Sequence, residues 1–108
     1  MADTKTINEF GIQPGTLKLI TGAFRLFPEI RQAVIFGSRA KNKFHNGSDI
    51  DIALTGEGIS FDTIVRLSGI LNEELPVPHH IDLVDLSHLN HENLKEHISR
   101  VGKVIYTA

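Results

Sequence analysis

The stretch GSRAKNKFHNGSDIDIALTG, residues 37–56, places two aspartates, Asp49 and Asp51, in a segment that otherwise has the pattern of a buried strand. Side chains alternate between the two faces of a strand, so both carboxylates lie on one face while Ile50 and Ile52 lie on the other. Like charges on one face repel each other, which predicts that a pKa is raised there or that a cation is bound. The segment is therefore a candidate functional site.

A third aspartate, Asp82, lies in a later segment, residues 81–86, that also has the pattern of a strand. If Ile81 and Leu83 face the helices, Asp82 faces the same side as the first pair and Asp85 points away. Carboxylate oxygens are the ligands that a hard cation such as Mg²⁺ prefers, so the three aspartates predict a magnesium site. The alternative is that each is an independent surface residue, the first of them capping a turn.

Gly37 and Ser38 end the preceding apolar segment, residues 32–36. Glycine lets the backbone approach a ligand closely, and serine offers an amide and a hydroxyl to a phosphate oxygen. The Gly-Lys-Ser/Thr ending of a P-loop does not occur here. A phosphate-binding strand end beside metal-binding carboxylates is what nucleotidyl transfer requires, because metal ions bridge the phosphates and the attacking oxygen.

Apolar periodicity and turn residues predict the other elements. Helices are expected at residues 14–27, at 61–75 after a Ser60 cap, and from a Ser87 cap to about 102, and strands at 32–36, 49–54, 81–86 and 103–107. Asn46-Gly47 predicts an antiparallel connection. The order predicts an α+β fold, a small mixed β-sheet with helices packed on one face, as one domain over residues 14–108 after an N-terminal tail of residues 1–13.

The composition narrows the classes of function. A chain of 108 residues with a formal net charge of −2 and no basic patch does not favour a nucleic-acid partner. The lack of cysteine excludes disulfides and cysteine-based zinc sites and suits a reducing compartment. No run approaches the roughly 20 apolar residues of a membrane span, so we expect a cytoplasmic protein that does not enter a membrane.

Aromatic and histidine residues have simpler interpretations. Phe24, Phe27 and Phe61 occur at helical spacing and are expected in the core. The six histidines are expected at the surface and at helix ends rather than around zinc, although His80 is placed to approach the acidic site from the strand that carries Asp82.

The motifs now support a family resemblance. Gly37-Ser38, ten residues and then Asp49-Ile50-Asp51 resembles the G-S-x10-D-x-D signature of the DNA polymerase β-type nucleotidyltransferases, and of their minimal (MNT) branch in particular. The segments HIDLVDL and ISRVGKVIY extend the resemblance over residues from about 14 to 106.

The resemblance implies roles for these residues. Gly37 and Ser38 would bind the triphosphate of ATP or another nucleoside triphosphate, and Asp49 and Asp51 would hold two magnesium ions. Asp82 would complete the catalytic metal site and help to deprotonate the acceptor hydroxyl.

The loop after Ser38 departs from the family pattern. Many members carry Arg-Ala-Arg-Gly there, whereas this chain has Arg39-Ala40-Lys41-Asn42. Arg39 and Lys41 are candidates to neutralise phosphate charge, or they belong to a solvated basic loop. Asn42 tolerates a left-handed backbone, so we expect the loop to form, but a bidentate phosphate contact from an arginine at position 41 is lost.

The resemblance also implies a partner. Minimal members pair with an all-helical HEPN protein as antitoxin and toxin, and the transferase silences the HEPN ribonuclease by moving AMP from ATP to one of its tyrosines. A hetero-oligomer with such a protein is the first expectation. Two alternatives stay open: a module that neutralises its partner by binding alone, and a transferase acting on RNA ends or a small molecule.

Overall fold

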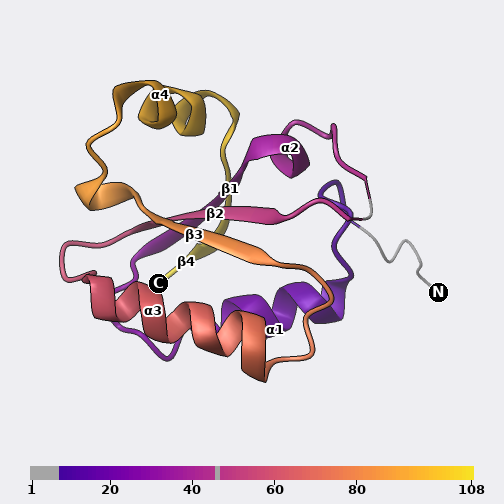
Figure 1. Cartoon of the computed structure of the whole chain (residues 1–108), viewed down its shortest axis with the longest axis horizontal. Coiled ribbons are helices and arrows are strands. Elements are labelled where there is room, and N and C mark those ends of the chain that lie inside the picture. The colour runs from indigo at the N-terminus through magenta and orange to yellow at the C-terminus, as the bar shows by residue number, and fades with distance from the viewer. Residues whose placement is uncertain (1–7, 46) are drawn as a thin grey trace.

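The computed structural model describes residues 8–45 and 47–108, which form a four-stranded sheet in the order β3-β2-β1-β4 (Figure 1). The strands are β1 (Gln32–Phe36), β2 (Ile50–Thr55), β3 (Ile81–Asp85) and β4 (Lys103–Thr107). β1 is antiparallel to β2 and β4, whereas β2 and β3 are parallel, so the predicted mixed sheet is confirmed. Residues 1–7 of the expected tail and Asn46 of the expected turn lie outside the described residues.

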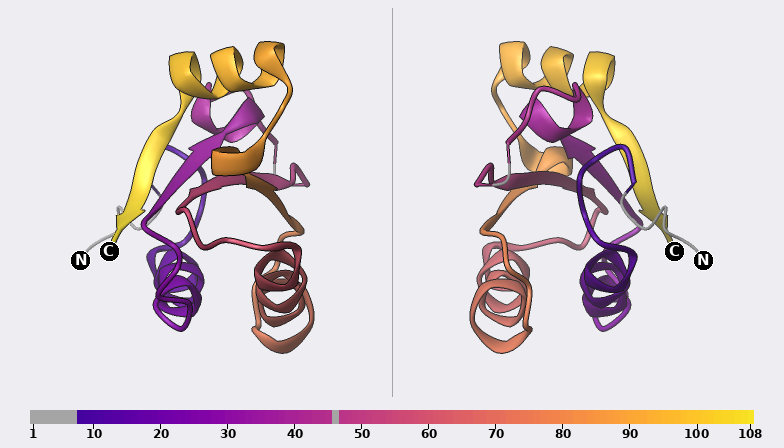
Figure 2. Two further views of the ribbon diagram at one scale, coloured as in Figure 1. Left: turned by 90° about the vertical axis from the view of Figure 1, so that its left-hand side faces the viewer. Right: turned by 90° about the vertical axis from the view of Figure 1, so that its right-hand side faces the viewer.

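Helices lie on both sides of this sheet (Figures 1 and 2). They are α1 (Pro14–Phe24), α2 (Gly37–Ala40), α3 (Phe61–Gly69), which continues into the π-helical turn η1 (Ile70–Glu74), the 3₁₀ turn η2 (Leu86–His88) and α4 (Glu92–Val101). α1 and α3 share one face, and the α+β class is confirmed. The placement of α4 corrects the expectation of a single helical face, because its buried Ile98 packs on Val34, Phe36 and Ala53 from the opposite side.

The main core lies between the sheet and the α1–α3 layer. Its fully buried strand residues are Ala33, Ile35, Ile50, Ile52 and Leu54. Phe10 and Ile12 also belong to this core, so residues 8–13 pack as part of the domain although they were expected in the tail. Because the apolar residues of β2 fill this face, Asp51 is turned to the other one.

One of the two predicted helix caps is confirmed, while the other cap and the burial of Phe61 differ from expectation. Ser60 caps α3 as predicted, in a capping box with Thr63. Ser87 does not cap α4: it lies in η2, where its Oγ accepts a hydrogen bond from the Gly56 amide at 2.8 Å, and the cap is His91. Phe61 is 83% exposed rather than buried, because it starts α3 ahead of the residues that reach the core.

None of the helices in the described part of the chain combines the length and apolar character that a membrane crossing requires.

Candidate active site

Gly37 and Asp51 meet where β1 ends. Phe36 pairs with Asp51 across the antiparallel strands, so the next residue, Gly37, begins α2 directly beside that carboxylate. The backbone of Gly37 has a φ of 75°, and a Cβ at this position would overlap Oδ2 of Asp51. Glycine is required here both for the left-handed backbone and for the space.

The sheet brings the three predicted carboxylates together on the α4 side. Asp51 and Asp82 are register partners in the parallel β2–β3 pair, and Asp49 precedes β2 on the same side by strand alternation. The pKa of Asp51 is raised, first by burial and then by the negative charges of Asp82 and Asp49, while His97 opposes the rise. The carboxylates therefore act on one another electrostatically, as their spacing predicted.

Asp82 also has a neighbour in His80, the residue that directly precedes β3. His80 Nε2 lies 3.0 Å from Asp82 Oδ1, and both side chains are about half exposed. The expectation that His80 approaches the acidic site is confirmed. The pair provides a proton-accepting group at the open side of the carboxylate cluster.

The donor set fits magnesium without forming a closed cage. Within the described ranges, no three histidine or acidic side chains converge closely enough to hold a metal ion by themselves. Magnesium is usually held by one or two carboxylates together with substrate phosphates and water, so carboxylate oxygens aligned on one face beside the Gly37-Ser38 turn suit it. Asp49 and Asp51 are the residues placed to hold such an ion, with Asp82 adjacent.

The loop after Ser38 forms a tight turn with an open basic side. The Lys43 amide donates to the Ser38 carbonyl at 2.9 Å, and Asn42 has a left-handed φ of 60°. The prediction that Asn42 accommodates this backbone is confirmed. Lys41 and Lys43 of this turn are exposed, so a phosphate can approach them.

Arg39 has a different place from the one expected. It is 1% exposed, and its guanidinium donates to the carbonyl oxygens of Ser48 at 2.8 Å and Phe10 at 2.8 Å. It also donates to Nδ1 of His79 at 3.2 Å and lies over the ring of Phe44. These contacts occupy the guanidinium within the protein, so Arg39 holds the segments around the site together and is not free to neutralise a phosphate.

His97 is a neighbour of the site that sequence reasoning missed. It projects from α4, its ring meets that of Phe36 edge-on at 6.2 Å between centroids, and its charge lowers the pKa of Asp51. The available signal was its position three residues after Leu94 on the apolar stripe of the helix, which turns it toward the sheet.

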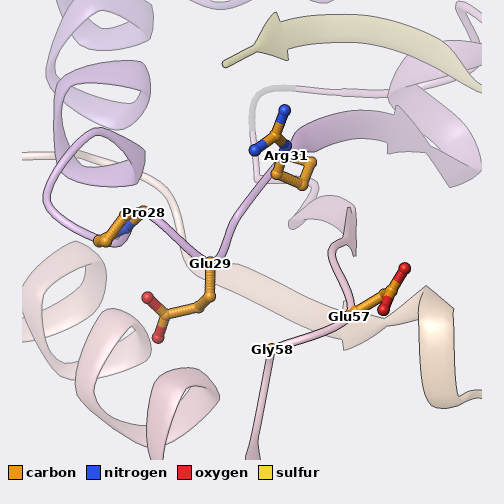
Figure 3. A pocket seen from close by; sticks show the side chains of 5 residues that line it. All are labelled: Pro28, Glu29, Arg31, Glu57 and Gly58. Atoms are coloured by element: carbon orange, nitrogen blue, oxygen red, sulfur yellow. The ribbon is translucent and has the colours of Figure 1, made fainter.

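A separate hollow of about 340 Å³ lies at the opposite end of β1 (Figure 3). Glu29 and Glu57 on its wall point away from each other. Glu29 accepts a hydrogen bond from Thr63 Oγ1 at 2.7 Å, which lowers the pKa of the Glu29 carboxyl and ties it to the start of α3. Glu29 therefore serves the fold rather than the carboxylate site.

A mixed sheet with a glycine-ended strand facing aligned carboxylates defines a nucleotidyltransferase-type domain. A family model described as "Polymerase beta, Nucleotidyltransferase" matches residues 18–108. The chain belongs to this family. A search of curated protein sequences found no significant match.

Solved structures share the fold. A toxin–antitoxin crystal structure with AMP-PNP is 24% identical with a TM-score of 0.72, and the match covers 85% of this chain and 73% of the other. An MNT antitoxin complex with a tri-AMPylated HEPN toxin from Shewanella oneidensis is 22% identical with a TM-score of 0.66, over 86% and 71% of the two chains. A putative nucleotidyltransferase from Sulfolobus solfataricus is 18% identical with a TM-score of 0.53, over 86% and 81%.

Proposed function

We propose that this protein is a magnesium-dependent nucleotidyltransferase that transfers AMP from ATP to a hydroxyl on a HEPN-type helical partner and acts as the antitoxin of that pair. The observation that carries the proposal is the contact between Gly37 and Asp51 with Asp82 as register neighbour. This arrangement supports the proposal because backbone suited to binding phosphate lies beside carboxylates suited to holding magnesium.

Each residue has a part in the transfer. Gly37 and Ser38 would bind the triphosphate through backbone and hydroxyl groups, and Asp49 and Asp51 would hold the two magnesium ions. Magnesium held there would supply positive charge to offset the charge on the phosphates and on the attacking oxygen. That oxygen forms a bond to the α-phosphorus as the bond to pyrophosphate breaks, and Asp82, supported by His80, receives the hydroxyl proton.

The similar structures support the proposed partner. In one of them an MNT antitoxin is bound to an AMPylated HEPN toxin. We propose that this chain forms an equivalent hetero-oligomer in the cytoplasm, in which the helical protein presents the acceptor hydroxyl at the open side of the carboxylate cluster.

The experiment that tests this function combines the purified protein, labelled ATP, magnesium and a HEPN-type helical protein encoded beside it. Label is expected on the partner with wild type and not with the Asp49→Ala, Asp51→Ala double variant. A partner that stays unlabelled, or that is labelled equally by both proteins, contradicts the proposal.

A second candidate is a module that neutralises its partner by binding alone. The exposed Lys41, where many family members carry arginine, favours it, because a bidentate phosphate contact is absent. This candidate predicts that millimolar ATP and magnesium leave the melting temperature unchanged. If the site binds nucleotide, ATP at 100 times its Kd raises the free energy of unfolding by about 2.7 kcal/mol. It also predicts that the double aspartate variant still protects cells from the partner.

A further inference from the structure

The side chain of Asn72, in η1, is bonded to the backbone of Ile81, the first residue of β3. Its Oδ1 accepts a hydrogen bond from the Ile81 amide at 2.8 Å, and its Nδ2 donates to the Ile81 carbonyl oxygen at 3.0 Å. Nδ2 also donates to Oγ of Ser68 at 3.2 Å, which fixes the orientation of the carboxamide. One side chain therefore pairs with both peptide groups of a strand residue, as a neighbouring strand would.

This contact matters because β3 is an edge strand that pairs with β2 on one side. Ile81 is 1% exposed, so its peptide groups have little access to water and need partners within the protein. The carboxamide of Asn72 supplies them where the sheet ends. Asn72 therefore holds the beginning of β3 in place at Ile81, the residue that enters the core.

The α3 helix ends in an irregular turn, η1, which places Asn72 next to Ile81. The Leu75 amide donates to the Ile70 carbonyl at 3.0 Å, five residues back, which is the spacing of a π-helical turn. Leu71 in this turn is fully buried in the core, and the next residue, Asn72, meets Ile81. Such turns interrupt the regular helix ladder and occur frequently at functional sites.

The strand start that Asn72 holds is adjacent to the acidic site. Asp82 follows Ile81 directly and is the register partner of Asp51. Side chains alternate along a strand, so a slip of β3 by one residue would turn Asp82 to the opposite face of the sheet. The position of Asp82 therefore depends on how firmly Ile81 is held.

We propose that Asn72 is a positioning residue that keeps Asp82 in register with Asp51 and so completes the metal-binding and proton-accepting side of the site. Its effect on rate rests on the proposed transferase function. Its effect on metal binding rests on the proposed magnesium site, whereas its effect on the geometry of β3 rests on neither.

Two variants and one control test this role. Asn72→Ala removes both bonds to Ile81, and the isosteric Asn72→Asp keeps an acceptor but loses the Nδ2 donor. Glu73→Ala, at the next and exposed position of the same turn, is the control. For each protein we would measure the free energy of unfolding, hydrogen exchange at the Asp82 amide, Mn²⁺ binding with a non-hydrolysable ATP analogue, and kcat and KM for AMP transfer.

Both Asn72 variants are expected to exchange faster at Asp82 and to lose about 10- to 100-fold in metal affinity and kcat, the range seen when a residue that orients a metal ligand is removed. KM for ATP should stay unchanged, because Gly37 and Ser38 lie in α2, at the end of β1, and make no contact with Asn72 through the bonds that are removed. Variants that are merely less stable, with wild-type metal binding, exchange and kcat, would overturn the proposal. If wild type transfers no AMP, the proposed function fails, while hydrogen exchange at the Asp82 amide still decides whether Asn72 holds the start of β3.

Discussion

Gly37 and Asp51 are in contact across the β1–β2 pair, and the space that a Cβ on Gly37 would need is taken by the Asp51 carboxylate. The contact therefore places the residue that we propose to bind phosphate directly beside one that we propose to hold metal. Substitutions at either residue therefore test the contact directly.

Replacing Gly37 by alanine should impair both stability and transfer. The alanine would hold a φ of 75°, which costs about 1–3 kcal/mol for a residue other than glycine, and would displace the Asp51 carboxylate. Urea denaturation and AMP transfer measure the two effects. Gly69→Ala is the control, because a Cβ there meets nothing within 4 Å, and it should leave transfer unchanged. Equal behaviour of the two variants would contradict the assigned contact.

Asp51→Asn should stabilise the protein at neutral pH while it abolishes function. The pKa of Asp51 is raised above its ordinary 3.8 by burial and by Asp82 and Asp49, so the folded state binds more protons than the unfolded state above that pH. The free energy of unfolding of the wild type therefore falls as the pH rises from 3.8 through the raised pKa. Asparagine does not ionise, so the variant does not lose this stability. Transfer should fall by at least about 100-fold, as it does when one charge-stabilising group is removed.

The measurement for Asp51→Asn is the free energy of unfolding from pH 3.5 to 7.5, compared with Asp62→Asn on the exposed surface of α3. A variant at position 51 that is less stable than wild type at pH 7.5 would show that the carboxylates are not in mutual repulsion.

Stability should also fall in mild acid through His79. Its Nδ1 accepts a hydrogen bond from Arg39, which requires the neutral ring, and its pKa is lowered by burial and by that cation. The unfolded state then binds more protons below pH 6.5, so stability is present above this value and is lost as pH falls toward the lowered pKa.

His79→Gln keeps an acceptor that does not titrate in this range and should flatten the dependence between pH 7.5 and 5. His45→Gln, at an exposed position, is the control and should keep the wild-type slope. The assignment fails if His79→Gln titrates like wild type.

Lys41→Arg should improve nucleotide binding. Lys41 is exposed next to Asn42, whose left-handed backbone already shapes the loop, so an arginine there gains a second charge-assisted bond to phosphate. One such bond is worth roughly 1.5 kcal/mol, which corresponds to about a tenfold lower KM for ATP. Lys43→Arg should change KM much less. A larger effect at position 43 would place the phosphates elsewhere.

The parts of the site that depend on strand alternation were predictable from the sequence. Asp49, Asp51 and Asp82 required only the period of a strand and the assumption that apolar residues face the helices. The left-handed Asn42 followed from the conformational range of asparagine.

Contacts between distant segments were not predictable in this way. Arg39 was expected at a phosphate, but its burial depends on carbonyl groups at Phe10 and Ser48 and on His79, which only the folded chain brings together. His91 caps α4 in place of Ser87 for a similar reason. Ser87 lies in η2, and its hydroxyl already accepts a hydrogen bond from the Gly56 amide. The register that sets Asp82 beside Asp51 is non-local as well.

The central claim is that the acidic face transfers AMP to a partner hydroxyl. Its most direct test uses ATP labelled in parallel at the α- and the γ-phosphate, with magnesium, the partner protein and either wild type or Asp51→Asn. We expect the partner to retain the α label, the γ label to leave in pyrophosphate, and the variant to transfer neither. A partner that acquires the γ label, or no label at all, would contradict it.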